Sequence, residues 1–202
     1  MHVLIDYQLG NLASIKQSFQ KAGIALVLSS DAETIMQADS LILPGVGAFG
    51  SAMASLESKG LIEAITLYAK QGKPLLGICL GMQLLFESSE EFGFHKGLGL
   101  LKGRVLAIPK DVTVPHMGWN RLMFSKPSHP ILQYSDDDDD VYFVHSYYVD
   151  GDAKDMIAFT EYGQSIPAIV GNGNIIAMQF HPEKSGAAGA RLIRSYKEMM
   201  RL

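Results

Sequence analysis

Short apolar runs recur along the first eighty residues and alternate with stretches of helical periodicity. The runs have the length of buried strands and lie at residues 3–6, 24–28, 41–43 and 75–78. After the first run, Asn11 can cap a helix that buries Ile15 and Phe19 and ends at Gly23, and Asp31 can cap a second, shorter helix. Two further helical stretches precede the run at residues 75–78. This order predicts an α/β fold, a three-layer sandwich with a largely parallel central sheet.

The pattern changes after about residue 98 to short β-rich pieces separated by glycine, proline and asparagine. These pieces lie at residues 141–149, 156–160, 166–170 and 175–180. We expect them to be antiparallel or mixed strands added to the sheet. A last helix begins near Ser185, and its buried stripe consists of Ala188, Leu192, Ile193, Tyr196 and either Met199 or Met200. No repeat or linker marks a boundary, so residues 1–202 are expected to form a single domain.

The composition, with 48% hydrophobic and 19% charged residues, is that of a globular protein. Cys79 is the only cysteine, which excludes a disulfide within the chain and a zinc site of the four-cysteine kind. With no secretory segment in view, a reducing, cytoplasmic location is expected. The longest apolar run, around residues 75–86, is far shorter than the ~20 residues that span a bilayer, so no membrane association is expected.

The formal net charge is −4, and five of the negative charges stand together at residues 136–140. Without this run the remaining chain would carry a charge close to zero. A near-neutral body argues against a nucleic-acid partner, because such proteins usually carry a strongly basic surface. The aspartate run is expected to be a solvated loop, since the spaced ligands of a calcium-binding loop are absent.

Cys79 stands between two glycines, directly after the apolar run at residues 75–78 and before a helical run at residues 82–87. This is the arrangement of a nucleophile elbow, with cysteine in place of serine. Gly77 and Gly81 leave out side chains that would clash in the tight turn, and the N-terminus of a helix favours a thiolate. The alternative is a structural cysteine that packs as a small hydrophobic residue. The flanking glycines favour the nucleophile.

Six histidines are candidates for the base that such a nucleophile needs: His2, His95, His116, His129, His145 and His181. Only His181 follows an apolar run and has a carboxylate two residues later, at Glu183. In an extended chain these two side chains point to the same side, so Glu183 can orient the ring of His181. The expected catalytic set is Cys79, His181 and Glu183. A metal site of His116, His145 and His181 lacks the usual short ligand spacings, and no metal is expected.

A glycine-containing loop at residues 44–49 follows the apolar run at residues 41–43. Its glycines would let backbone N–H groups turn into a cavity. Together with the N–H of Leu80, the loop could hold the negative charge that develops on a carbonyl oxygen during acyl transfer. An ordinary turn is the alternative. A phosphate-binding loop is disfavoured because neither a Walker lysine nor the dinucleotide glycine spacing is present.

Five motifs resemble those of a known family. Residues 77–83 (Gly-Ile-Cys-Leu-Gly-Met-Gln) and 179–183 (Gln-Phe-His-Pro-Glu) resemble the two signatures of class I, triad-type glutamine amidotransferases. Residues 44–49, 115–120 and 142–147 resemble the glutaminase subunits of imidazole glycerol phosphate synthase. The resemblance extends essentially from residue 3 to the end of the chain.

The resemblance implies hydrolysis of L-glutamine to L-glutamate and ammonia, with Cys79 attacking the amide carbon and no cofactor. It also implies roles for further residues: Val46, Gly47 and Leu80 at the oxyanion site, Gln83, Ser146 and Tyr147 in holding glutamine, and Lys184 in contact with a partner. The implied partner in a heterodimer is a (β/α)8-barrel cyclase. That cyclase uses the ammonia to make imidazole glycerol phosphate and an aminoimidazole carboxamide ribonucleotide in histidine biosynthesis.

Two features depart from the family pattern: Gln8 stands where the family usually has glycine, and the aspartate run at residues 136–140 is unusual. Two alternatives also remain open. A glutaminase of another pathway, such as pyridoxal phosphate synthesis, shares the nucleophile and base, but its oxyanion stretch usually reads Pro-Gly-Gly, unlike residues 44–46 here. A binding module without activity could use the same fold, although the intact triad residues argue against it.

Overall fold

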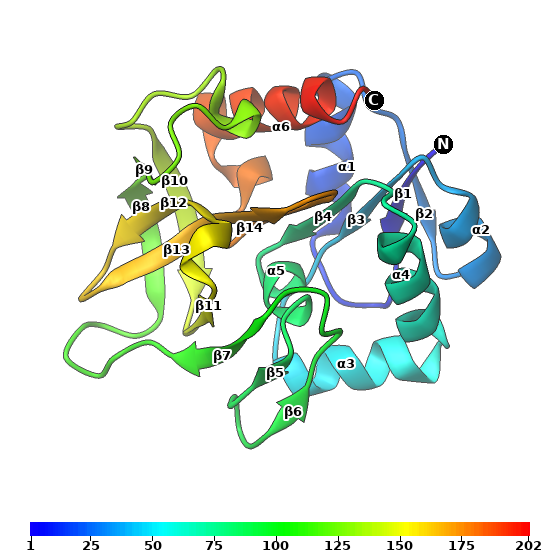
Figure 1. The fold of residues 1–202 in the computed structure, drawn as a ribbon, viewed down its shortest axis with the longest axis horizontal. Helices are drawn as coiled ribbons and strands as arrows, with labels where there is room; N and C mark the ends of the chain where they lie inside the picture. The colour runs from blue at the N-terminus through cyan, green and yellow to red at the C-terminus, as the bar shows by residue number, and fades with distance from the viewer.

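A computed structural model of the protein describes residues 1–202 and is built around one eight-stranded sheet (Figure 1). In spatial order its strands are β2 (Leu26–Ser29), β1 (His2–Ile5), β3 (Ser40–Leu43), β4 (Leu75–Ile78), β14 (Ile175–Met178), β13 (Ser165–Asn172), β12 (Met156–Glu161) and β9 (Met123–Phe124). The first five are parallel, and the last three join antiparallel. β4 and β14, at the centre, carry the segments with the predicted nucleophile and base.

Helices cover both faces of this sheet, which confirms the predicted α/β sandwich. On one face lie α1 (Leu12–Lys21) and α6 (Gly186–Met199); on the other lie α2 (Ala32–Gln37), α3 (Phe49–Ser58), α4 (Leu61–Lys70) and the short α5 (Leu80–Leu84). Val3 and Ile5 of β1 pack in the core under α2 to α5, and Leu4 packs in the core under α1 and α6. Successive side chains of a strand point to opposite faces, so one strand contributes to both cores.

The expected helix caps are present. The side chain of Asn11 accepts a hydrogen bond from the backbone N–H of Ser14, and that of Asp31 accepts one from Thr34. The helical run predicted at residues 82–87 differs: α5 starts immediately after Cys79 and ends at Leu84. Its N-terminal peptide groups therefore lie directly beside the thiol.

Residues 88–151 add two smaller sheets that the sequence did not predict. In one, β8 (His116–Arg121) pairs with β10 (Asp140–His145); the other contains β11 (Tyr147–Gly151), β7 (Gly103–Ala107), β5 (Ser88–Ser89) and β6 (His95–Lys96). Three single-turn 3-10 helices complete the structure: η1 (Pro130–Leu132), η2 (Ala153–Asp155) and η3 (Pro182–Lys184).

The expectation that residues 141–149 form one strand of the main sheet was wrong. The chain changes partner at Ser146, so that β10 pairs with β8 and β11 pairs with β7. Apolar and aromatic residues stand on both sides of His145 and Ser146, so residues 141–149 look like a single β-rich piece in the sequence. The pieces at residues 156–160, 166–170 and 175–180 do join the main sheet.

The aspartate run is only partly the solvated loop that we expected. Asp138 is exposed, but the side chain of Asp139 is largely covered and forms an ion pair with Arg191 of α6. Asp137 accepts a hydrogen bond from the backbone N–H of Phe124 at 2.7 Å. The run therefore attaches the loop to α6 and β9.

Gln8 adopts a left-handed backbone conformation with φ of 71°. This region favours glycine, since a Cβ atom clashes there with the backbone. The glycine that the family usually has at this position is thus explained by the backbone. None of the helices combines the length and the apolarity that crossing a membrane requires.

Candidate functional site

Cys79 lies in a strained turn at the carboxyl end of β4. Its φ of 55° and ψ of −114° are unusual for a residue with a side chain, and they resemble the strained geometry of nucleophile elbows. A Cβ atom at Gly77 would lie 2.9 Å from the carbonyl oxygen of Gly81, and one at Gly81 would collide with the carbonyl group of Leu43. Both glycines are required because β4, α5 and β3 approach each other closely at this turn.

His181 and Glu183 follow β14, the parallel neighbour of β4, so they reach the same edge of the sheet as Cys79. His181 Nδ1 donates a hydrogen bond to Glu183 Oε1 at 2.8 Å, and both side chains are almost completely buried. Burial, the largest single influence, lowers the pKa of His181. Its interactions with Cys79 and with Glu183 outweigh burial, and the pKa is raised above its ordinary value. The site therefore favours an imidazolium ring beside the sulfur.

A cavity of about 440 Å³ opens in front of Cys79. It is lined by Val46, Gly47, Cys79, Leu80, Gln83, Glu91, Pro115, Val144, His145, Ser146, Tyr147, His181 and Lys184. Every residue that the sequence proposed for the site lines this cavity except Glu183, which lies behind His181. The structure thus brings together residues that are up to 138 positions apart in the chain, between Val46 and Lys184.

The loop between β3 and α3 forms one wall of this cavity. Gly47 has a φ of 89°, which a residue with a side chain rarely adopts. A Cβ atom at Gly45 would lie 2.6 Å from the hydroxyl of Tyr7, so the loop packs closely against its support. Leu80, opposite, is the first residue of α5, where backbone N–H groups have no partner within the helix.

Gln83 joins the helix after Cys79 to the opposite wall. Its Nε2 donates to the carbonyl oxygen of Tyr147 at 2.9 Å and to Gln179 Oε1 at 3.0 Å. Gln179 Nε2 in turn lies 3.9 Å from Cys79 Sγ. The backbone of Ser146 and Tyr147 is therefore linked by side-chain hydrogen bonds to the base of the turn that carries the thiol.

Two residues of the site were missed by the sequence reasoning, Glu91 and Gln179. The buried Glu91 lines the cavity and accepts a hydrogen bond from the backbone N–H of Phe49, at the start of α3, at 2.6 Å. No local motif predicts this contact, because the two residues are 42 positions apart. Gln179 stands within the second signature, directly after β14, and that position was the available signal.

Of the three histidines considered as metal ligands, His116 and His145 bond to each other and His181 bonds to Glu183. His116 Nδ1 lies 3.0 Å from His145 Nε2, and His145 Nδ1 donates to the carbonyl oxygen of Tyr147 at 2.8 Å. No group of three or more His, Cys, Asp or Glu side chains is placed to hold a metal ion.

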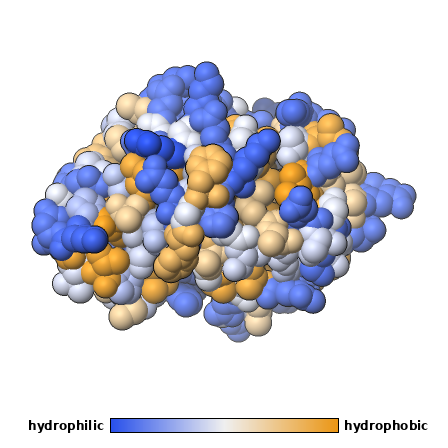
Figure 2. Space-filling model, turned by 90° about the horizontal axis from the view of Figure 1, so that it is seen from below, coloured by the Kyte–Doolittle hydropathy of each residue, from blue (hydrophilic) through white to orange (hydrophobic).

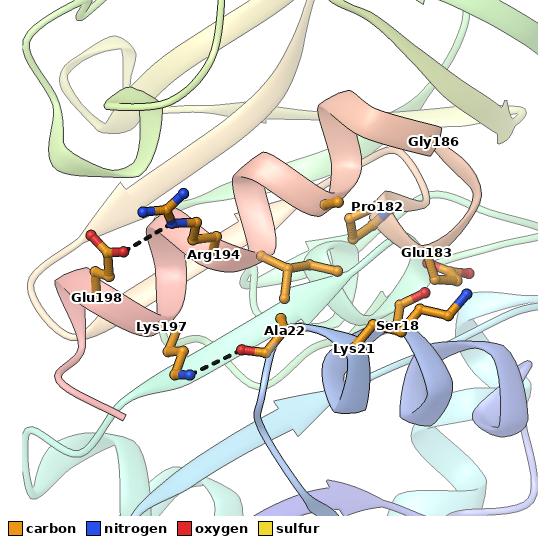
Figure 3. A pocket seen from close by; sticks show the side chains of 11 residues that line it. Ser18, Lys21, Ala22, Pro182, Glu183, Gly186, Arg194, Lys197 and Glu198 are labelled. Atoms are coloured by element: carbon orange, nitrogen blue, oxygen red, sulfur yellow. Dashed lines mark hydrogen bonds and ion pairs between the residues drawn. The ribbon is translucent and has the colours of Figure 1, made fainter.

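A second cavity, of about 630 Å³, lies behind Glu183 between α1 and α6 (Figure 3). Within it Arg194 bonds to Glu198, and Lys197 bonds to the carbonyl oxygen of Ala22. Neither cysteine nor histidine lines it. Glu183 Oε2, at its edge, is buried and has no hydrogen-bond partner, so the only hydrogen bond of this carboxylate is the one to His181.

Residues 3–196 match the sequence model of the family Glutamine amidotransferase class-I. The chain belongs to this family. Among curated proteins, it is 51% identical over 197 residues to the imidazole glycerol phosphate synthase subunit HisH of Lactococcus lactis subsp. lactis (strain IL1403), covering 97% of both chains. It is 47% identical to the HisH subunit of Lactiplantibacillus plantarum (strain ATCC BAA-793 / NCIMB 8826 / WCFS1), covering 99% of this chain and 96% of the relative. The family resemblance found in the sequence is confirmed.

Solved structures share the fold of this chain. A crystal structure of a glutamine amidotransferase superposes with a TM-score of 0.78 at 19% identity, covering 99% of both chains. The structure of PurLQS from Thermotoga maritima gives a TM-score of 0.77 at 19% identity, covering 98% of this chain and 97% of that one. At this identity the likeness shows the shared fold.

Proposed function

We propose that this class-I amidotransferase hydrolyses L-glutamine to L-glutamate and ammonia in the cavity in front of Cys79. The thiolate of Cys79 attacks the carboxamide carbon, and the C–N bond breaks as His181 protonates the amide nitrogen, which leaves as ammonia. His181 then takes a proton from water, which attacks the thioester, and the Cys79 thiolate leaves as glutamate forms. The observation that carries this proposal is the hydrogen-bonded His181–Glu183 pair beside a thiol in an elbow turn.

Charge that develops on the carbonyl oxygen would be held by backbone N–H groups on both sides of the thiol. Leu80 supplies one from the start of α5, and the loop containing Val46 and Gly47 supplies the other. Donors of this kind are usually worth several kcal/mol in acyl transfer, because they face the charge only as it forms. Leu80 and the loop residues Val46 and Gly47 line the same cavity as Cys79.

Glutamine would lie between α5 and the wall formed by Ser146 and Tyr147. Gln83 and the backbone of this wall offer polar contacts for the amino-acid part of the substrate. Glu91 adds a buried carboxylate on the cavity surface, and a carboxylate suits the α-ammonium group of an amino acid. The cavity thus carries acceptors and donors for a zwitterionic substrate.

The ammonia would pass to a (β/α)8-barrel cyclase, as in histidine biosynthesis, within a cytoplasmic heterodimer. Support comes from the relatives, which are named as subunits of imidazole glycerol phosphate synthase. Large apolar side chains are also exposed, including Met117, which is 65% exposed, and Trp119, which is 57% exposed. Trp119 and Lys184 both lie close to the ring of Tyr142, near the cavity. Figure 2, which views the molecule of Figure 1 from below, shows apolar patches between hydrophilic side chains.

The test is glutamate release by the chain assembled with the cyclase, in the presence and absence of the cyclase's ligand. Cys79→Ala should lower the rate by about 1,000-fold or more, because removing the nucleophile leaves only binding and electrostatic effects. Ser58→Ala, at an exposed position on α3, is the matched control and should keep the wild-type rate. We expect the ligand to stimulate turnover, since coupling of the two sites would save ammonia.

Other results would favour the alternatives. Turnover that depends on a different acceptor enzyme would indicate a glutaminase of another pathway. A wild-type rate in the Cys79→Ala complex would reject the cysteine mechanism. Failure of a glutamine-like electrophile to modify Cys79, with or without the partner, would favour a binding module.

A further inference from the structure

A line of side-chain hydrogen bonds leads from β8, on the surface, to the wall of the reaction cavity. It begins at Asn120, passes through His116 and His145 and ends at the carbonyl oxygen of Tyr147. The two histidines are 3% and 7% exposed. Neither is needed to move a proton in glutamine hydrolysis, so their burial beside the cavity requires another explanation.

The donor and acceptor of each ring follow from the end of this line. A carbonyl oxygen can only accept, so His145 Nδ1 carries the hydrogen that bonds to Tyr147. Burial lowers the pKa of His145 to about 4 and of His116 to about 4, so both rings are neutral near pH 7. His145 Nε2 is then an acceptor, and His116 Nδ1 donates to it at 3.0 Å. His116 Nε2 in turn accepts from Asn120 Nδ2 at 3.3 Å.

The carbonyl group of Tyr147 therefore receives hydrogen bonds from two elements. His145 of β10 donates from one side, and Gln83 of α5 donates from the other at 2.9 Å. Between His145 and Tyr147 lies Ser146, where the chain passes from one small sheet to the other. On the other side of His145, the carbonyl oxygen of Val144 lies 4.0 Å from Cys79 Sγ. The ring of His145 is therefore bonded to the cavity wall at the point where the chain changes sheet.

Aromatic packing holds the first ring of the line in place. His116 stacks on Tyr162 with ring centroids 3.9 Å apart and on Phe143 with centroids 4.7 Å apart. The stacked rings explain the orientation of His116. They do not explain why its two ring nitrogens form hydrogen bonds with His145 and Asn120. Packing alone would be satisfied by phenylalanine at this position.

We propose that His116 and His145 are positioning residues that hold the Ser146–Tyr147 backbone in the conformation that binds glutamine. This inference rests on the proposed glutaminase function. His145 acts directly, by its hydrogen bond to Tyr147, and His116 acts through His145 by fixing its tautomer and ring orientation. Neither histidine is a catalytic residue, because the reacting atoms are served by Cys79 and His181.

The test compares His116→Phe with His116→Asn in the complex with the cyclase and its ligand. Phenylalanine keeps the stacking and removes the hydrogen bonds, whereas asparagine places an N–H donor near the position of Nδ1. We expect His116→Phe to raise the KM for glutamine by about tenfold, as the loss of one buried hydrogen bond predicts, with kcat changed less than twofold. His116→Asn should return KM to within about threefold of wild type. The alkylation rate of Cys79 by iodoacetamide should be the same in all three proteins.

Other outcomes would overturn the inference. An unchanged KM in His116→Phe would mean that the histidine pair has no positioning role. Equal losses in both variants, with slower alkylation of Cys79, would indicate packing alone. If His116→Phe does not fold, His145→Asn, which keeps a donor to Tyr147, is compared with His145→Leu, and equal KM values would reject the proposal. Absence of glutamine turnover in the wild-type complex would instead overturn the proposed function.

Discussion

Acid should destabilise this protein through the buried pair of neutral histidines. Burial lowers the pKa of His116 to about 4 and of His145 to about 4, whereas in the unfolded chain both pKa values are close to 6.5. Between these values the unfolded chain binds protons that the folded chain excludes. The stabilising contribution of each ring is therefore complete above pH 6.5 and is lost progressively as the pH falls towards 4.

The magnitude follows from the pKa difference. One pKa unit corresponds to about 1.4 kcal/mol. At pH 5 each ring should therefore lower the free energy of unfolding by about 2 kcal/mol relative to neutral pH. The two rings together would cost at most about 4 kcal/mol, which is a large part of the typical stability of a domain. The hydrogen bond from His116 to His145 links the two rings, because protonation of His145 Nε2 would break it.

Urea denaturation of the wild type and of His116→Phe at pH 7 and pH 5 measures this effect. Groups outside the histidine pair titrate equally in both proteins, including His181, whose raised pKa acts in the opposite direction. We expect the variant to lose about 2 kcal/mol less than the wild type between the two pH values. Equal losses in the two proteins would refute the idea that these rings are kept neutral by the fold.

Three further substitutions test local features of the structure. Gly81→Ala should lower stability by about 3 kcal/mol or more, because its Cβ would collide with the carbonyl group of Leu43; an unchanged melting temperature would contradict this packing. Gln8→Gly should raise the free energy of unfolding by about 1 kcal/mol, measured in urea, because it relieves a left-handed conformation; a loss would contradict the strain. Asp139→Asn should cost about 1 kcal/mol through its ion pair with Arg191, while the exposed Asp138→Asn should be neutral, and equal effects would argue against the pair.

Local signals in the sequence predict the parallel half of the fold well. The apolar runs, the caps at Asn11 and Asp31 and the glycines around Cys79 each act over a few residues, and each specifies one element or turn. The parallel strands are buried on both faces, as β1 is, so they stand out in the sequence as short continuous apolar runs. The placement of the predicted nucleophile and base at one sheet edge then follows from the topology.

The sequence could not predict features that depend on distant partners. The change of sheet at Ser146 is set by β8 and β7, the strands that pair on either side of it, and both partners are distant in the sequence. Glu91 reaches the cavity only because its segment folds against the start of α3. Asp139 is held by Arg191 on α6, and a run of identical aspartates gives no sign of which one is anchored.

Covalent capture of Cys79 tests most directly whether this cavity is a glutaminase site. The complex is treated with a chloroketone analogue of glutamine, and the modified residue is located by peptide mass spectrometry while glutamate release is followed. We predict one adduct, on Cys79, that forms more slowly when L-glutamine is present and that abolishes glutamate release in proportion to its amount. Continued glutamate release after complete modification of Cys79 would contradict the proposed mechanism.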